Sequence, residues 1–361
     1  MIKKEKPSVV YLTNIPAPYR EKMHEILSDS KQINYTVIYC SDLEPNRQWK
    51  FDKGRYNMVY LSHTATKMIH NNFNVIKHLN DYNPDVVIST GFNPTMLYSF
   101  IWCKLKGKKF VPFTDGTYDS EKSLSSIHKL VRRIVFRFSA SFIGASLGSM
   151  RLYDSYEIPK NKTFKSCLCI ENQKFNNQVL DKKYDLMFSG QLIERKMPLF
   201  FAEVAKEVKE KTGDCNVLIL GDGPLRNDLI ALLTKYGITF DYAGFVQPSS
   251  LPWYYSQCKI FLFPTLNDPW GIVANEACAA GLPVITCDAA GAANDLIVHD
   301  LNGYVLPLET KTWVNHICGL LSAPHKLELL SANAVKIVQK YNHQLSANGI
   351  LASVKFALAG V

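Results

Sequence analysis

Two carboxylates with the spacing of a binding site lie in the second half of the chain. In the stretch NDPWGIVANEACAAGLPVI, residues 267–285, Asp268 precedes a short apolar run and Glu276 lies inside it. The glycines predict a helix that begins around Gly271 and ends before Gly281. A helix N-terminus presents free N–H groups and a partial positive charge, which together favour an anion. Carboxylates on either side of that anion suit hydroxyl groups, so the segment predicts a ligand built as sugar, phosphate, sugar, which is a nucleotide sugar.

A pair of adjacent cations follows another predicted strand. The segment YDLMFSG ends at Gly190, and Arg195 and Lys196 come a few residues later. Because charge-assisted hydrogen bonds to phosphate are strong, two cations near the carboxyl end of a strand suit a diphosphate. Charged pairs are also common on solvated turns, and the pair alone does not distinguish the two interpretations.

A glycine-rich turn follows a third predicted strand, in CNVLILGDGP. Gly221 and Gly223 would let the backbone approach a ligand, and Pro224 suits the start of the next helix. The third glycine of the dinucleotide-binding fingerprint is missing. A tight structural turn and a nucleotide contact therefore both fit this segment.

The elements that must position these groups follow the same order in both halves. Short apolar runs rich in β-branched residues alternate with helical patterns, which is typical of parallel, doubly wound sheets. Strands are predicted at residues 8–14, 34–40, 85–90, 108–114, 140–146, 184–190, 215–221, 238–244, 259–265 and 282–287. Helices are predicted at residues 19–27, 95–107, 128–139, 198–213, 224–237 and 271–281. We expect an α/β protein of two Rossmann-like domains facing across a cleft, with ligands at the carboxyl ends of the strands.

The length of the chain also favours two domains, because 361 residues exceed what one core usually serves. The polar stretch of residues 171–184 is the predicted linker. The expected domains are residues 1–175, which would bind an acceptor, and residues 176–342, which would bind a donor. The C-terminal helix, about residues 343–361, is expected to pack back on the first domain.

Composition indicates a globular protein of a reducing compartment. Hydrophobic residues make up 47% and charged residues 20% of the chain. The nine cysteines are an odd number and form no CxxC motif, which favours free thiols in a cytosol over disulfides or a metal site. The N-terminal segment lacks the pattern of a secretory signal, and no segment approaches the roughly 20 apolar residues of a spanning helix. We therefore expect a cytoplasmic protein that does not cross a membrane by itself.

The excess of positive charge lies entirely in the first half. Residues 1–175 carry 26 Lys and Arg against 15 Asp and Glu, and residues 176–361 carry 15 against 17. Either a solvated basic face or an anionic partner, such as a phospholipid surface or a phosphate-bearing acceptor, fits this excess. Nucleic acid is disfavoured, because the sequence has no zinc finger, no RNP-like motif and no basic tract with interleaved aromatic residues.

Both interpretations of the basic residues apply to one predicted helix. In residues 128–139, Leu130, Ile134 and Phe138 fall on one stripe, with basic residues along its flanks (Lys129, Arg132, Arg133 and Arg137). Amphipathic helices usually pack their apolar stripe inward, which predicts a core-facing helix with a solvated basic edge. Alternatively, the basic edge rests on an anionic inner-leaflet surface together with four lysines, Lys104, Lys106, Lys108 and Lys109.

The second half resembles the family 4 retaining glycosyltransferases, which have the GT-B fold. Four motifs carry the resemblance in the family's order, over roughly residues 184–310. They are an acid, seven residues and a Glu (Asp268 and Glu276, around PWG), a GxL…RK loop (Gly190, Leu192, Arg195, Lys196), a GxGP turn (Gly221 to Pro224) and a GFV loop (Gly244, Phe245, Val246). In the first half, NIPAPYR and CLCIENQKF also look familial.

The resemblance implies roles for individual residues. Glu276 would bind the ribose diol, Asp268 the donor sugar hydroxyls, and Arg195 with Lys196 the diphosphate. The remaining donor-binding residues would be Gly190, Gly221 and Gly223, then Gly244, Phe245 and Val246 beside the base, and Trp270, Gly271, Ile272 and Val273 at the phosphates. Acceptor binding would fall to Asn14, Tyr19 and Arg20.

Three positions depart from the family pattern. The family often has Glu where Asp268 stands and Arg where Gln191 stands. Many members also have a His after the strand that corresponds to residues 108–114, where this chain has Thr114-Asp115-Gly116. Asp115 is the nearest titratable substitute and is therefore the remaining candidate catalytic residue, although a turn aspartate fits the position as well.

The resemblance predicts an enzyme that moves a sugar, with retention, from a UDP- or GDP-linked donor to a glycan or polyprenyl-diphosphate-linked acceptor, in bacterial surface polysaccharide synthesis. No cofactor and no metal are expected, and the enzyme would be cytoplasmic or peripheral at the inner face of the membrane. The alternatives are a catalytically degenerate nucleotide-sugar-binding protein and a GT-B epimerase or phosphorylase.

Overall fold

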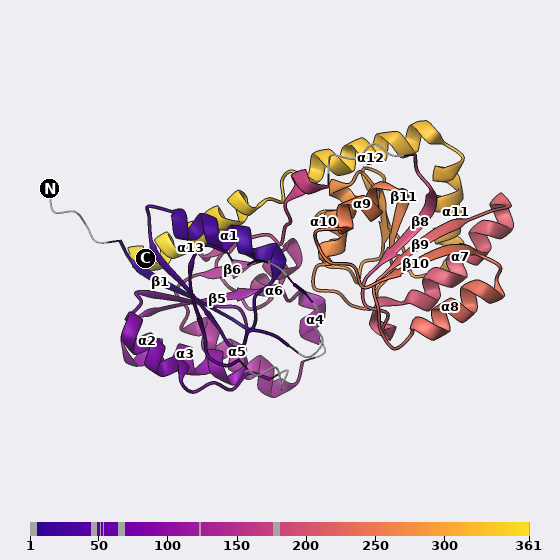
Figure 1. The fold of residues 1–361 in the computed structure, drawn as a ribbon. Helices are drawn as coiled ribbons and strands as arrows, with labels where there is room; N and C mark the ends of the chain where they lie inside the picture. Colours follow the sequence, from indigo (N-terminus) through magenta and orange to yellow (C-terminus); the bar gives the residue numbers. More distant parts are fainter. Residues whose placement is uncertain are drawn as a thin grey trace. The chain divides into compact units, whose positions relative to one another are not determined.

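The computed structural model describes residues 6–44, 49–50, 52, 54–63, 69–122, 124–175 and 181–360. The chain divides into two compact units (Figure 1): unit 1 is Met1–Leu168 with His343–Val361, and unit 2 is Cys169–Asn342. The division falls at Leu168, whereas the sequence analysis placed the boundary at residue 175. Residues 176–180 of the expected linker lie outside the described residues.

Unit 1 is built on a parallel sheet. Its strands are β1 (Ser8–Thr13), β2 (Asn34–Tyr39), β3 (Asn57–Tyr60), β4 (Val86–Ser89), β5 (Lys109–Thr114), β6 (Phe142–Gly144) and β7 (Thr163–Lys165). Its helices are α1 (Pro18–Asp29), α2 (Val75–Tyr82), α3 (Pro94–Leu105), α4 (Tyr118–Lys122), α5 (Ser126–Arg137), α6 (Leu147–Ser155) and α13 (His343–Ala359), with the 3-10 turn η1 (Lys160–Lys162). The spatial strand order is β3-β2-β1-β4-β5-β6-β7.

The apolar runs form strands because both faces of this sheet are covered. In β1, Val10 and Leu12 belong to the core beneath α2, α3 and α5. Tyr11 points to the other face, where its ring lies 5.0 Å from that of His24 in α1. Burial on both faces explains why the predicted strands are continuous apolar runs and not alternating ones.

Unit 2 repeats the architecture. Its strands are β8 (Tyr184–Ser189), β9 (Asn216–Leu220), β10 (Thr239–Gly244), β11 (Cys258–Phe263), β12 (Val284–Thr286) and β13 (Gly303–Val305). Its helices are α7 (Pro198–Thr212), α8 (Arg226–Lys235), α9 (Leu251–Ser256), α10 (Ile272–Ala279), α11 (Thr310–Leu321) and α12 (Pro324–Val338), with the 3-10 turns η2 (Asn172–Lys174) and η3 (Glu194–Lys196). The strand order is β10-β9-β8-β11-β12-β13, and its described pairs are parallel.

The predicted fold class, α/β with two Rossmann-like parallel sheets, is confirmed. Each predicted strand coincides with a strand of the structure, but three strands escaped prediction: β3, β7 and β13. These three are short strands of three or four residues at the edges of the two sheets.

Both sheets reverse their strand order at one point, between β1 and β4 in unit 1 and between β8 and β11 in unit 2. In open α/β sheets, ligands bind at such switch points, beyond the carboxyl ends of the strands. Among the described residues, no helix has both the length and the apolar character needed to span a bilayer.

The expectation that the apolar stripe of residues 128–139 faces the core is wrong. Leu130, Ile134 and Phe138 are exposed, whereas Val135 and Phe136 of the same helix are buried. The helix carries apolar residues on two sides, and the side that contains Val135 packs against the sheet.

Candidate functional site

Three loops meet at the carboxyl ends of neighbouring strands in unit 2. Gly190 follows β8, Gly221 follows β9, and Gly244 ends β10. The Gly190 N–H donates to the Leu220 carbonyl at 3.0 Å, and the Gly221 N–H donates to the Gly244 carbonyl at 2.7 Å. These bonds continue the pairing of the sheet past its strands, so the structure brings the three predicted glycines together.

The loops approach so closely that only glycine fits at two positions. Gly221 has φ of 119°, and a Cβ there would lie 1.8 Å from the carbonyl oxygen of Gly190. A Cβ at Gly223 would lie 2.5 Å from the carbonyl oxygen of Leu192. The close approach requires glycine at both positions whether or not a ligand binds there.

Helix α10 begins at Ile272, as the sequence predicted. Its N-cap residue Gly271 has a left-handed conformation, with φ of 88°, and no side chain among the described residues caps the helix. A Cβ at Gly271 would lie 2.2 Å from the ring of Phe263 at the end of β11. The first N–H groups, those of the half-buried Ile272 and Val273, therefore keep the capacity of a helix N-terminus to bind an anion.

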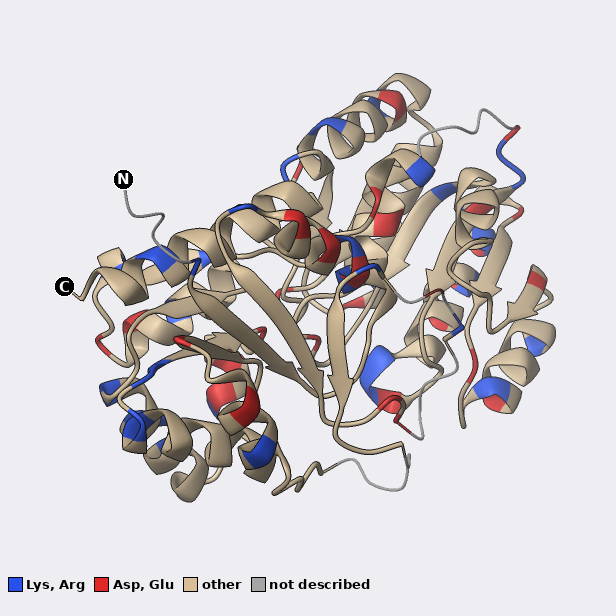
Figure 2. Cartoon of the chain, turned by 60° about the vertical axis from the view of Figure 1, so that its left-hand side comes forward, with Lys and Arg blue, Asp and Glu red and all other residues tan. Residues whose placement is uncertain are grey.

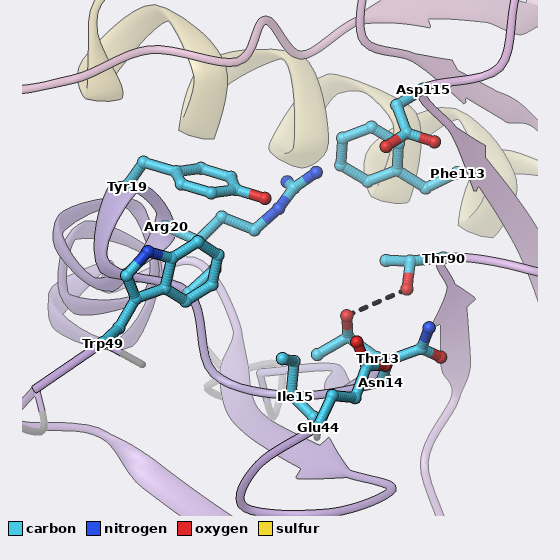
Figure 3. A pocket seen from close by; sticks show the side chains of 11 residues that line it. Thr13, Asn14, Ile15, Tyr19, Arg20, Glu44, Trp49, Thr90, Phe113 and Asp115 are labelled. Carbon is cyan, nitrogen blue, oxygen red and sulfur yellow. Dashed lines mark hydrogen bonds between the residues drawn. The ribbon is translucent and has the colours of Figure 1, made fainter. Parts of the chain in front are cut away.

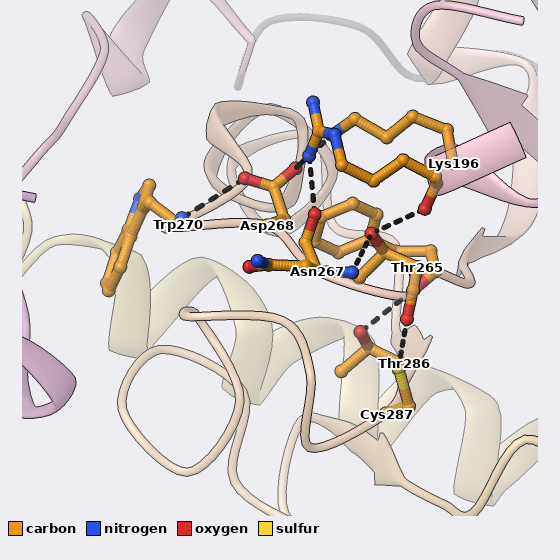
Figure 4. A network of polar contacts seen from close by, with 9 residues as sticks. Lys196, Thr265, Asn267, Asp268, Trp270, Thr286 and Cys287 are labelled. Atoms are coloured by element: carbon orange, nitrogen blue, oxygen red, sulfur yellow. Dashed lines mark hydrogen bonds and ion pairs between the residues drawn. The ribbon is translucent and has the colours of Figure 1, made fainter. Parts of the chain in front are cut away.

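The loop before α10 holds Asp268 against a cation from the neighbouring strand (Figure 4). Asp268 is buried; its Oδ2 forms an ion pair with Nζ of Lys196, and its Oδ1 accepts the Trp270 N–H at 3.1 Å. The Asp268 backbone is fixed as well, because Gly291 donates its N–H to the Asp268 carbonyl at 2.8 Å. Lys196 follows β8 and Asp268 follows β11, so the pair spans the switch point.

Arg195 lies beside this pair but nearer the surface. Its side chain is 42% exposed, compared with 14% for Lys196. Its Nη1 donates to the Asn267 carbonyl at 2.5 Å and lies 3.9 Å from Oδ2 of Asp268. The two predicted cations are thus together, one in an almost buried ion pair and one at the surface.

Glu276 is buried on α10. Its Oε2 accepts a hydrogen bond from the Tyr255 hydroxyl at 2.8 Å. Burial raises the pKa of Glu276 to about 7, although the Tyr255 bond acts in the opposite direction. The carboxyl therefore changes charge near neutral pH, and its ionised form suits the hydroxyl groups of a diol. Sequence reasoning missed Tyr255, which positions this carboxyl.

The other predicted donor residues differ in exposure. Trp270 is buried: its Nε1 donates to Oδ1 of Asn275 at 2.7 Å, and its ring lies 5.6 Å from that of Tyr341. The indole therefore supports the loop from inside unit 2. Phe245 is exposed and Val246 half-buried, directly after Gly244.

Unit 1 has a cavity of about 230 Å³ at its own switch point (Figure 3). The four candidate acceptor-binding and catalytic residues of the first half line this cavity: Asn14, Tyr19, Arg20 and Asp115. The other lining residues were not predicted from the sequence; they are Thr13, Ile15, Ala17, Glu44, Trp49, Thr90 and Phe113.

The cavity combines aromatic faces with charges of both signs. The Arg20 guanidinium lies 4.8 Å from the centre of the Phe113 ring, and the Trp49 ring meets the edge of Tyr19 at 6.2 Å. Asp115 is exposed, whereas the buried Glu44 places Oε1 3.1 Å from Nε2 of His70. A polar ligand with an apolar face, such as a sugar, fits a lining of this kind.

In comparison with known proteins, one family model matches part of this chain. Residues 170–337 match the model described as glycosyl transferases group 1. The α-D-kanosaminyltransferase of Streptomyces kanamyceticus is 29% identical over 174 residues, which are 47% of this chain and 44% of that protein. An uncharacterised glycosyltransferase of Methanocaldococcus jannaschii is 25% identical over 305 residues, 78% of this chain and 74% of that protein. The chain spans less than half the length of four curated relatives that it matches.

Among solved structures, HepE from Anabaena in complex with UDP is similar over 96% of this chain and 99% of that chain. The TM-score is 0.76 at 14% sequence identity, a likeness that shows the fold. The chain therefore has the fold of GT-B glycosyltransferases, and its residues 170–337 carry the segment that the group 1 glycosyl transferase model describes.

Proposed function

We propose that the chain is a retaining glycosyltransferase. It moves a sugar from a UDP- or GDP-linked donor to a hydroxyl group of a glycan or of a lipid-linked acceptor. The observation that carries the proposal is the arrangement in unit 2, where an uncapped helix N-terminus, two cations and two buried carboxylates gather around one switch point. A nucleotide sugar has the matching sequence of groups: a ribose diol, a diphosphate and a hexose.

Each part of the donor has a candidate partner. Glu276 binds the ribose diol, because its ionised carboxyl accepts two hydroxyl hydrogen bonds. The N–H groups of Ile272 and Val273, with Arg195 and Lys196, hold the diphosphate. Asp268 receives the hydroxyls of the donor sugar. Gly244, Phe245 and Val246 line the base, and the loops at Gly190, Gly221 and Gly223 flank the phosphates.

The chemistry rests on positioning and on charge. In retaining transfer of this type, the acceptor hydroxyl attacks the face from which the diphosphate leaves, while negative charge grows on the phosphate. Cations and helix N–H groups aimed at that phosphate stabilise the transition state more than the ground state. The chain itself supplies this positive charge, and we therefore propose a transfer that requires no metal.

The acceptor side falls to unit 1. Asn14, Tyr19 and Arg20 bind the acceptor in the 230 Å³ cavity, and Asp115 orients the attacking hydroxyl group. Aromatic faces beside polar groups suit a saccharide. A role in bacterial surface polysaccharide synthesis stays a prediction from the sequence.

The decisive experiment screens UDP-, GDP- and ADP-linked sugars for binding, by thermal shift, and for release of nucleoside diphosphate. We expect one donor class to bind and to be hydrolysed slowly. Glu276→Ala should abolish that binding while the fold persists, because a helix tolerates alanine. Glu210→Ala, an exposed helical glutamate of the same unit, is the matched control and should bind normally.

Two other outcomes would redirect the proposal. Donor binding without turnover toward any acceptor or water would mean a degenerate binding protein. No binding of any nucleotide sugar by the folded chain would refute the assignment. Once an acceptor is known, NMR of the product tests the stereochemistry, since inversion at the anomeric carbon would contradict a retaining mechanism.

A further inference from the structure

One face of unit 1 exposes several large apolar side chains, and the proposed activity does not explain their exposure. Helices α3 and α5 cover the same side of the sheet, where Phe100 and Val135 pack into one core. Their C-terminal ends lie side by side, because Nζ of Lys104 donates to the Phe138 carbonyl at 2.5 Å. We call the outer surface of these two helices the α3–α5 face.

The apolar residues of the α3–α5 face lie on the outer stripes of both helices. They are Ile101 and Leu105 from α3, with Ile127, Leu130, Ile134 and Phe138 along α5. Leu105 is 81% exposed and Ile127 is 73% exposed, and the other four are each about half exposed. The α5 residues recur at helical spacing, so they form one continuous ridge. Contiguous apolar surface of this kind marks an interaction site.

The charge of the α3–α5 face has a single sign. Lys104, Lys106, Arg133 and Arg137 are exposed and Lys129 is half-buried along the ridge. Residues 86–114 and residues 124–153, which contain both helices, include no Asp or Glu. Figure 2 shows the basic residues of the chain in blue and the acidic residues in red.

Arg132 does not belong to the face. Its guanidinium forms an ion pair with Glu121 and lies 5.0 Å from the centre of the Phe92 ring, and its side chain is only 15% exposed. Lys108 is likewise engaged, with Nζ 3.3 Å from Oδ1 of Asp85. The exposed cations that remain beside the apolar ridge are Lys106, Arg133 and Arg137, together with Lys104, whose Nζ is bonded to the Phe138 carbonyl.

We propose that the α3–α5 face docks on the surface of an anionic phospholipid bilayer. An amphipathic helix lies in such an interface with its apolar side chains at the boundary of headgroups and acyl chains, and with Lys and Arg beside the lipid phosphates. The charge of the face matches this partner. A second copy of the chain fits poorly, because an isologous contact would bring the basic residues of one face against those of the other. The proposal does not depend on the proposed enzymatic activity.

Vesicle co-sedimentation with the full chain tests the proposal. The vesicles are either phosphatidylcholine alone or equal parts of phosphatidylcholine and phosphatidylglycerol. We expect the chain to sediment with the mixed vesicles and to stay in the supernatant with phosphatidylcholine alone. Raised salt should release it, because screening weakens the attraction of basic residues to the lipid surface. Equal binding to both vesicle types, or to neither, would overturn the proposal.

Two variants and a control locate the contact. Arg133→Glu/Arg137→Glu should weaken binding by at least about 20-fold, since each basic residue beside such a surface strengthens binding by about fivefold. Leu130→Gln/Ile134→Gln should weaken it by about tenfold or more through loss of apolar insertion. Lys311→Glu/Lys336→Glu changes two exposed lysines of unit 2 by the same charge and should bind as the wild type does.

Circular dichroism verifies that each variant folds, and all of the exchanged side chains are exposed. Wild-type binding by both face variants would refute the proposal, as would equal loss in the control. Analytical ultracentrifugation tests whether the face binds a second copy of the chain. If the wild-type chain bound neither vesicle type but formed a dimer, and Leu130→Gln/Ile134→Gln dissociated that dimer, the face would be assigned to self-association instead.

Discussion

The switch points of the two units are built in different ways. In unit 2, backbone geometry makes the candidate site: Gly190, Gly221 and Gly244 join neighbouring strand ends through N–H to carbonyl bonds, and α10 starts at a left-handed Gly271. In unit 1, side chains make it: the cavity is lined by Arg20 of α1, by Phe113 of β5, and by Trp49 and others from separate loops. The first site tightly constrains a few glycines in short loops, and the second loosely constrains many residues from different elements.

This difference predicts how each region responds to mutation. Substitutions at the closely packed glycines of unit 2 should affect folding and donor binding together, because the same backbone serves both. Substitutions in the unit 1 cavity should affect ligand binding with little effect on stability.

The largest effect is expected for Gly221→Val. The φ of 119° and the carbonyl oxygen 1.8 Å from a Cβ leave no room for a side chain, and that oxygen belongs to a loop that is itself hydrogen-bonded. The free energy of unfolding should fall by at least about 4 kcal/mol, from backbone strain and overlap together. Urea unfolding of unit 2 measures the loss.

Gly213→Ala is the matched control. Gly213 also has positive φ, at 88°, but a Cβ there meets nothing within 4 Å. Its cost should be about 1 kcal/mol, the penalty for the left-handed conformation alone. Equal costs for the two variants would contradict the idea that contact between loops fixes glycine at residue 221.

The second prediction separates the two adjacent cations. Lys196→Met leaves the almost buried Asp268 carboxylate without its closest cation and should cost about 3 kcal/mol of stability. Arg195→Met removes a half-exposed group and should cost less than about 1 kcal/mol. Both variants should lose turnover. Thermal unfolding and the rate of nucleoside diphosphate release measure the two effects separately.

A double variant that removes both charges of the ion pair is the control for this prediction. Lys196→Met/Asp268→Asn removes both charges and should recover most of the stability, although not the turnover. If Arg195→Met destabilised the chain as much as Lys196→Met, the two cations would share one structural role, and the proposed division between them would fail.

The sequence predicted the fold and the unit 2 loops for the same physical reason. Buried parallel strands need continuous apolar runs, and close backbone contacts need Gly and Pro within a few residues, so both leave local signals. The cavity residues Glu44, Trp49 and Phe113 leave none, because their proximity depends on the strand order. Tyr255 leaves no signal either, because only the fold brings its hydroxyl to Glu276. In α5, Leu130 and Val135 lie on two apolar sides with similar spacing, and only packing on the sheet decides which side is buried.

The third prediction concerns the pH response of Glu276. Its pKa is raised from 4.5 to about 7, so the folded chain holds a proton there between these values while the unfolded chain does not. Its contribution to stability is therefore complete below pH 4.5 and is lost as pH rises through 7, a change of roughly 3 kcal/mol. Glu276→Gln should remove this slope from urea-unfolding curves collected across the window.

Donor binding should show the opposite dependence on pH. Diol hydroxyls donate to the ionised carboxyl, so affinity for a nucleotide sugar should fall by up to about tenfold for each pH unit below 7. A nucleotide sugar is the right probe, because its diphosphate is esterified at both ends and has no ionisation near neutral pH. If donor affinity stayed constant within about a factor of two from pH 5 to 8, Glu276 would not bind the diol.

A small effect on stability is expected for Trp49→Ala in the unit 1 cavity. The indole is half-buried and meets Tyr19 edge to face at 6.2 Å, so its loss removes one aromatic contact worth about 1 kcal/mol. If the acceptor sugar packs on this ring, the acceptor KM should rise about tenfold while donor affinity is unchanged. Phe73→Ala, an exposed aromatic residue of the same unit outside the cavity lining, should change neither. A loss of donor affinity in Trp49→Ala, with the acceptor KM unaltered, would reverse the assignment of the two sites, because the ring would then belong to the donor.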